Sequence, residues 1–236
     1  MLAVRRYMFA VHLVLIAVTL TPFLVVETPG LGDYLNHLAR MHVLAEYDNS
    51  PKLRSLYVLQ DWLRPYLAMD LIVPHLARFM SIYDAGRVFS ALAMLLPVLG
   101  AVALHRTVWG TVGVVPVLAY LVAYNTMLSW GFLSYLLACG LALLLLAAWI
   151  RTATWPRWRR ALFFAVAATL VFFCHLVAFG AYCLAVAGVE FGRAWRAGRE
   201  QWRTIAQDWA AAAAQAIPAA LVFSRLDVRN VSVGPA

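Results

Sequence analysis

Long apolar runs are the feature of this 236-residue sequence that most restricts its fold. Several of them approach the roughly 20 residues that an α-helix needs to cross a bilayer. Lipid offers no hydrogen-bond partners, so the backbone polar groups of such a run must be paired within its own helix. Charged residues make up only 13% of the chain, about half the share usual in soluble domains. The sequence therefore predicts an all-α fold, a polytopic transmembrane helical bundle that forms one membrane domain over residues 1–236.

The arginines decide how these runs are arranged. The runs cover residues 7–26, 67–80, 84–104, 112–128, 131–150, 161–190 and 209–224. If 67–80 crossed the membrane, the basic loop 151–160 would lie outside, although basic residues concentrate in short cytoplasmic loops. If 67–80 lies on the outer surface and 161–190 is split at His175, eleven of the 19 basic residues fall in short cytoplasmic segments. The second arrangement is therefore favoured.

The favoured arrangement has about seven spans, with the N-terminus in the cytoplasm. The expected spans are 7–26, 84–104, 112–128, 131–150, 161–173, 176–190 and 209–224. Residues 27–83 then form an outer loop that contains two juxtamembrane amphipathic helices, over 33–47 and 67–80. The clustering of arginines beside apolar runs also accounts for the net charge of +8, so we expect membrane lipid rather than nucleic acid as a partner.

Most of the acidic side chains lie in this outer loop or directly after it. Seven of the eleven in the chain are found there, namely Glu27, Asp33, Glu46, Asp48, Asp61, Asp70 and Asp84. Three of the six histidines, His37, His42 and His75, share the same segment. A membrane protein that gathers its ionisable groups outside the bilayer is expected to have its chemistry there.

Asp33 is the candidate catalytic residue of this segment. Within the expected helix 33–47, Asp33, His37 and Arg40 follow the i, i+4, i+7 spacing and so share one face, with Asn36 beside them. A carboxylate in such a place can act as a general base, while cationic donors stabilise an anionic leaving group. Alternatively, Asp33 only caps the helix by accepting a hydrogen bond from the Asn36 amide. His37 would act as a metal ligand or proton relay, or would be a solvated surface residue.

Arg64 and His175 are candidate ligands for a phosphate group. Arg64 precedes Pro65 at the expected lipid–water boundary, where a guanidinium can bind phosphate bidentately or simply anchor the segment. His175 interrupts an apolar run, which in a membrane protein indicates a function; the alternative is a histidine bonded to a neighbouring carbonyl. Asn125 and Tyr135 flank another outer turn and are expected to form a second wall of the cavity.

Taken together, these motifs resemble the GT-C superfamily of integral-membrane glycosyltransferases, in particular the bacterial branch of protein mannosyltransferases and aminoarabinose transferases. The matching pieces are Gly32-Asp33-Tyr34-Leu35-Asn36-His37-Leu38-Ala39-Arg40, Arg64-Pro65-Tyr66-Leu67-Ala68-Met69-Asp70 and Ala85-Gly86-Arg87-Val88. In that family an acidic residue after the first span is the catalytic carboxylate, and two juxtamembrane helices follow it. Typical members are considerably longer and often carry lysine where this chain has His175, so the chain resembles a short or truncated member.

The resemblance implies an inverting glycosyltransferase in the bacterial cytoplasmic (inner) membrane. It would move a sugar from a polyprenyl-phosphate donor to an acceptor on the outer face. Asp33 and His37 would serve catalysis, and Arg64, Arg40 and His175 would bind the lipid phosphate. No cofactor is assigned, although a pyrophosphate donor would require a divalent metal more often than a monophosphate donor.

The sequence leaves two other functions open. One is a non-catalytic membrane scaffold or a partner subunit of a larger enzyme, which the short length favours. The other is a transporter, which would need ionisable groups along a path at membrane depth. Between Arg87 and Arg151 the only charged or histidine residues are His105 and Arg106, which lie near the expected inner boundary. The lack of such groups at membrane depth argues against transport.

Overall fold

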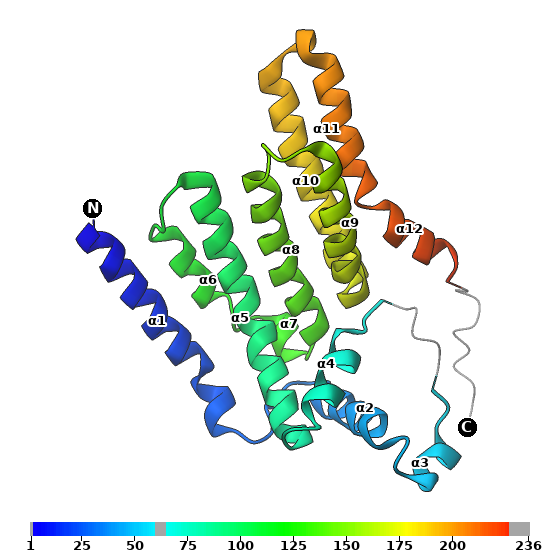
Figure 1. The fold of residues 1–236 in the computed structure, drawn as a ribbon. Coiled ribbons are helices and arrows are strands. Elements are labelled where there is room, and N and C mark those ends of the chain that lie inside the picture. Colours follow the sequence, from blue (N-terminus) through cyan, green and yellow to red (C-terminus); the bar gives the residue numbers. More distant parts are fainter. Residues whose placement is uncertain (1, 60–64, 227–236) are drawn as a thin grey trace.

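The fold is helical throughout the residues that the computed structural model describes, 2–59 and 65–226 (Figure 1). The helices are α1 (Leu2–Val25), α2 (Tyr34–Glu46), α3 (Pro51–Leu56), α4 (Ala68–Leu76), α5 (Ile82–Trp109), η1 (Val115–Val117), α6 (Leu118–Leu121), α7 (Thr126–Ser129), α8 (Leu133–Arg151), α9 (Arg157–Cys174), α10 (Leu176–Ala197), η2 (Arg199–Gln201), α11 (Trp202–Ala214) and α12 (Ile217–Ser224). Of these, η1 and η2 are 3₁₀ helices. The all-α class expected from the apolar runs is confirmed.

Four of the helices are long and apolar enough to cross a membrane: α1 from Tyr7 onward, α5, α8 and α10. Helix α8 packs against α5 on one side and against α9 and α10 on the other (Figure 1). The expected break at His175 is present, because α9 ends at Cys174 and α10 begins at Leu176. His175 itself has an extended backbone, with φ −165° and ψ 122°. The expected spans 161–173 and 176–190 therefore lie within two longer helices.

Two of the expected spans are not continuous helices. The run 112–128 is divided among η1, α6 and α7. Pro116, which lacks a backbone N–H, lies in η1, and the Asn125 side chain starts α7 by accepting a hydrogen bond from Leu128 N at 3.0 Å. The run 209–224 is divided between α11, which ends at Ala214, and α12, which begins at Ile217. Pro218 stands in the first turn of α12, where a backbone N–H would have no partner within the helix.

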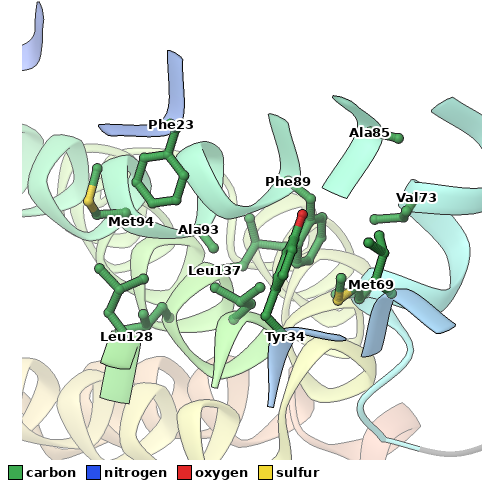
Figure 2. Close-up of a cluster of buried hydrophobic side chains, with 14 of the residues drawn as sticks. Phe23, Tyr34, Met69, Val73, Ala85, Phe89, Ala93, Met94, Leu128 and Leu137 are labelled. Atoms are coloured by element: carbon green, nitrogen blue, oxygen red, sulfur yellow. The ribbon is translucent and has the colours of Figure 1, made fainter. Parts of the chain in front are cut away.

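A core of buried side chains fixes α2 and α4 against the N-terminal parts of α5 and α8 (Figure 2). Tyr34 from α2, Val73 from α4 and Phe89 from α5 are all fully buried. Met69 and Leu137 complete this contact from α4 and α8. Because Tyr34 directly follows Asp33, its burial in the core fixes where the candidate carboxylate lies.

The backbones of α5 and α8 approach each other at two glycines. A Cβ atom added to Gly140 of α8 would lie 2.5 Å from the carbonyl carbon of Leu96 in α5. A Cβ atom added to Gly100 of α5 would lie 2.7 Å from the Cβ of Leu143. Small residues allow such close packing between helices in lipid, where dispersion contacts replace the hydrophobic effect as the driving force.

We expect Gly140→Ala to destabilise the protein by about 1–3 kcal/mol, because the new methyl group would force α5 and α8 apart. Gly188→Ala in α10 is the matched control, since a Cβ atom there meets nothing within 4 Å. The measurement is the unfolding midpoint of each purified variant in detergent. Equal midpoints for the two variants would contradict the close packing.

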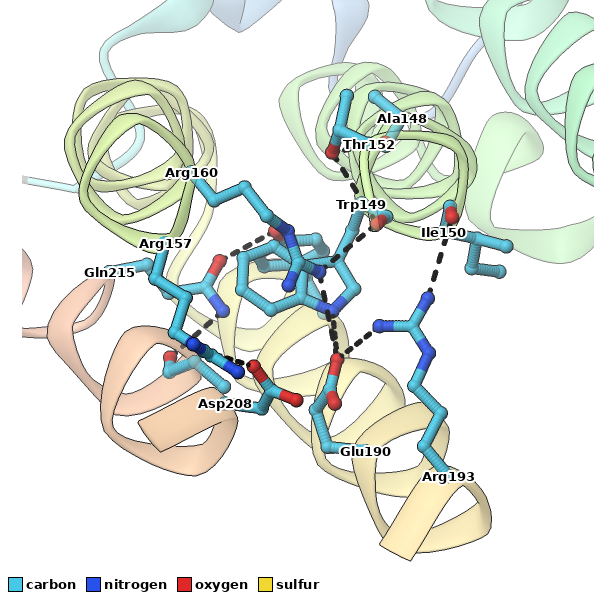
Figure 3. A network of polar contacts seen from close by, with 12 residues as sticks. Ala148, Trp149, Ile150, Thr152, Arg157, Arg160, Glu190, Arg193, Asp208 and Gln215 are labelled. Atoms are coloured by element: carbon cyan, nitrogen blue, oxygen red, sulfur yellow. Dashed lines mark hydrogen bonds and ion pairs between the residues drawn. The ribbon is translucent and has the colours of Figure 1, made fainter. Parts of the chain in front are cut away.

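A buried network of charges joins α8, α9 and α10 (Figure 3). Arg160 and Glu190 are each only 2% exposed, and Arg160 Nη2 lies 3.7 Å from Glu190 Oε1. The same oxygen accepts hydrogen bonds from Trp149 Nε1 at 2.7 Å and from Arg193 Nη1 at 2.6 Å. The Arg160 guanidinium stacks 3.8 Å from the centre of the Trp149 ring. The positive-inside pattern places Arg160 and Arg193 in cytoplasmic segments, and nothing in it predicts this network.

Glu190→Gln should lower the free energy of unfolding by about 3–5 kcal/mol, because it removes the negative charge from a buried arginine while keeping the side-chain shape. Asp208→Asn is a suitable comparison. Asp208 pairs with Arg157 at 2.7 Å, but both side chains are partly exposed, so its loss should cost about 0–1 kcal/mol. Chemical denaturation in detergent measures both, and a small loss in Glu190→Gln would show that the network contributes little.

Candidate functional site

Two main-chain hydrogen bonds place Asp33 at the start of α2. Gly32 N donates to Ser129 O at 2.8 Å, and Asp33 N donates to Trp130 O at 3.2 Å. The turn that supplies these acceptors continues through Gly131, which has a φ of +85°. A Cβ atom on Gly131 would lie 3.1 Å from Asp33 N. Glycine is therefore needed here both for the left-handed backbone and for the close approach.

The Asp33 carboxylate is held by its neighbours on α2. Asn36 Nδ2 donates to Asp33 Oδ1 at 2.8 Å, and His37 Nε2 lies 3.2 Å from Asp33 Oδ2. The side chain of Asp33 makes no capping hydrogen bond to the helix backbone, although Asp33 occupies the N-cap position. The capping alternative is therefore not what the structure shows. The side chain is 45% exposed, so a ligand can reach the carboxylate.

Arg40 forms an ion pair with Asp70 and so connects α2 to α4. The Asp70 side chain is 11% exposed, whereas that of Arg40 is 52% exposed. The sequence analysis expected Arg40 to bind a lipid phosphate. The structure adds a carboxylate partner from another helix, so a phosphate at Arg40 would have to compete with Asp70 or bind beside it.

His175 lies between two tyrosine rings at the break between α9 and α10. The ring centre of Tyr66 is 4.6 Å away and that of Tyr135 is 4.9 Å away, both edge-on. Leu67 N donates to Phe173 O at 2.8 Å, which ties the start of α4 to this break. His175 Nδ1 is buried and has no hydrogen-bond partner among residues 2–59 and 65–226. Burial lowers the pKa of the His175 imidazole, so the ring is neutral at neutral pH.

One cavity of about 250 Å³ brings these groups together. Its lining side chains come from α2, from residues around Tyr66, from the start of α8 and from the α9–α10 break; they are Asp33, His37, Arg40, Tyr66, Met69, Asp70, Phe132, Leu133, Ser134, Tyr135 and His175, with Gly131. Four of the five residues predicted for the site thus share one cavity, and the fifth, Arg64, lies outside the described residues. Tyr135 also stands where a second wall was expected.

Tyr66 and Asp70 are cavity residues that the sequence analysis did not assign to the site. Nothing in the local sequence places Asp70 opposite Arg40, because the pair forms only through the packing of α4 on α2. Tyr66 adopts a left-handed backbone with φ 77°, which is rare for a residue other than glycine. Backbone strain of this kind is kept where the surrounding structure requires it, and here it aims the Tyr66 ring at His175.

The site has no cluster of metal ligands in the part of the chain that the structure describes. Within residues 2–59 and 65–226, no three His, Cys, Asp or Glu side chains form a group that could hold a metal ion.

Comparisons with protein-family models, with curated proteins and with solved structures found no match to this chain.

Gly131→Ala should loosen the start of α2, because the added methyl group would push against Asp33 N. Gly110→Ala is the control, since Gly110 also has a left-handed φ of +73° but a Cβ atom there meets nothing within 4 Å. Both variants carry the backbone cost of about 1–2 kcal/mol for a left-handed alanine. Hydrogen exchange of the peptide covering residues 32–34 should accelerate only in Gly131→Ala. The same protection in both variants would show that the turn does not hold Asp33.

Proposed function

We propose that this protein is an integral-membrane glycosyltransferase of the GT-C type. It transfers a sugar from a polyprenyl-phosphate donor to a hydroxyl-bearing acceptor on the outer face of the membrane. The observation that carries the proposal is the single cavity that holds Asp33, His37, Arg40 and His175. These residues come from segments more than a hundred positions apart, and they provide a base, a cation and an unsatisfied imidazole in one place.

Asp33 is the general base of the proposed reaction. Its carboxylate accepts the proton of the acceptor hydroxyl while that oxygen attacks the anomeric carbon of the donor sugar. The bond between the anomeric carbon and the phosphate oxygen breaks on the opposite side, and the phosphate leaves with the electron pair. This displacement inverts the anomeric configuration. Asn36 donates to one carboxylate oxygen and His37 lies beside the other, and these two contacts orient the base before the acceptor arrives.

The leaving phosphate is bound by Arg40 and His175 in this proposal. Arg40 supplies positive charge at the cavity wall, partly balanced by Asp70. His175 contributes a hydrogen bond rather than a charge, because burial lowers its pKa. Nδ1 of His175 lacks a partner within the part of the chain that the structure describes, and a buried polar atom of this kind costs free energy until a ligand satisfies it.

The proposed membrane arrangement is multi-pass, with about seven crossings of the bacterial inner membrane and the N-terminus in the cytoplasm. Helix α8 begins with residues that line the cavity and ends at Arg151, about 28 Å away for 19 residues. Figure 1 shows the end of α5 and the start of α9 at this same end of the bundle. We call this the arginine end; it contains Arg106, Arg151, Arg157, Arg159, Arg160, Arg193, Arg196 and Arg203. The positive-inside rule puts it in the cytoplasm and the cavity outside.

Asp33→Asn should reduce sugar transfer at least about a hundredfold, since asparagine cannot accept the proton. Asp48→Asn removes an exposed carboxylate from the same segment outside the cavity, and it should retain full activity. The assay measures transfer of labelled sugar from a polyprenyl-phosphate donor in membranes that contain equal amounts of each variant. Full transfer by Asp33→Asn would reject the assignment, and a chain that copurifies with a larger transferase would then fit a partner subunit.

A further inference from the structure

Tryptophan side chains are exposed beside the arginines at the arginine end. Trp158 in the first turn of α9 is 64% exposed, and Trp202 at the start of α11 is 62% exposed. Trp109, the last residue of α5, and Trp195, near the end of α10, are exposed as well. Tryptophan favours the membrane–water interface, where its ring contacts acyl chains and its N–H reaches water.

Two arginines at this end stack on these indoles and carry uncompensated charge. The guanidinium carbon of Arg159 is 5.1 Å from the centre of the Trp158 ring, and that of Arg203 is 5.4 Å from the centre of the Trp202 ring. Among the residues that the structure describes, neither Arg159 nor Arg203 forms an ion pair with a carboxylate. Their neighbours differ, because Arg157 pairs with Asp208 and Arg160 with Glu190.

The position of Arg159 on α9 is itself unfavourable without an anion. The first turn of α9 carries Arg157, Arg159 and Arg160 and no acidic residue. The N-terminus of a helix is the positive end of its dipole, so cations there repel it. Protein carboxylates offset this repulsion for Arg157 and Arg160 only. An anion from outside the protein would offset it for Arg159.

An apolar stripe runs along α9 directly from this arginine–tryptophan pair. Leu162, Val166 and Leu170 follow Trp158 at intervals of four residues, and each is about as exposed as Trp158. Side chains at this spacing lie on one face of a helix. A molecule with a phosphate at one end and a hydrocarbon chain at the other matches the order of Arg159, Trp158 and this stripe.

We infer that the arginine end is a binding surface for anionic phospholipids, with one phosphate headgroup at Arg159, another at Arg203, and an acyl chain of the first along the exposed stripe of α9. Guanidinium groups suit this ligand, because they bind phosphate oxygens bidentately and tolerate partial desolvation beside a ring. Of the 19 basic residues of the chain only Lys52 is lysine, so nearly every basic site offers this geometry. The inference concerns lipid binding at the end away from the cavity and does not depend on sugar transfer.

The test is tryptophan fluorescence of the full chain reconstituted in mixed vesicles of phosphatidylglycerol and phosphatidylcholine. Bromine on the acyl chains of one lipid at a time quenches the indoles that this lipid contacts. We expect stronger quenching when the bromine is on phosphatidylglycerol at the same mole fraction. In the double variant Arg159→Gln/Arg203→Gln, the ratio of the binding constants of the two lipids should fall about thirtyfold, the effect of about two basic residues near an anionic surface.

The matched control is Arg54→Gln/Arg78→Gln, which removes two charges from the cavity end of the chain and leaves the arginine end unchanged. This control should keep the phosphatidylglycerol preference of the unmodified protein. Equal quenching by the two lipids in the unmodified protein would overturn the inference and favour an acidic protein as the partner. An equal loss of preference in both double variants would also overturn it, because the effect would then reflect net charge alone.

Discussion

Two hydrogen bonds between backbones join the segments that carry opposite sides of the cavity. They join Gly32 and Asp33 to the carbonyls of Ser129 and Trp130, and they bring the start of α2 to the turn that precedes α8. On one side of this contact stand Asp33 and His37, and on the other stand Ser134 and Tyr135. Residues separated by about a hundred positions thus face one another because of a main-chain contact. This contact positions the side chains that line the cavity.

The sequence predicted the parts of the fold that depend on local patterns. Apolar runs indicated α1, α5, α8 and α10, and the polar interruption at His175 indicated where α9 ends. The spacing of Asp33, His37 and Arg40 placed them on one helical face, and all three line the cavity. The breaks within 112–128 and 209–224 were missed, because hydropathy averages over the proline and capping residues that end those helices.

Contacts between distant segments could not be predicted in the same way. Asp70 pairs with Arg40 only because α4 packs across α2, and no spacing in the sequence contains that information. The pairing of Arg160 with Glu190 has the same origin. The positive-inside rule predicts that arginines beside apolar runs lie in cytoplasmic loops. Nothing in the sequence indicates that one of them, Arg160, turns inward to a carboxylate thirty residues away. Such pairs become visible only once helix packing is known.

The glycine contact between α5 and α8 has a consequence for the two walls of the cavity. Gly100 faces the Leu143 side chain and the Gly140 carbonyl, and Gly140 faces the backbone of Leu96 and Pro97, so the two helices lie too close for one to slide past the other. Helix α8 carries Leu133, Ser134 and Tyr135 of the cavity lining, and its contact with α5 holds this wall in place. The opposite wall is built from α2, α4 and the turn at Tyr66, which are shorter and lie at the edge of the bundle (Figure 1). The left-handed backbone of Tyr66 lies in this opposite wall, so the strained part of the cavity lining stands apart from the rigid α5–α8 contact.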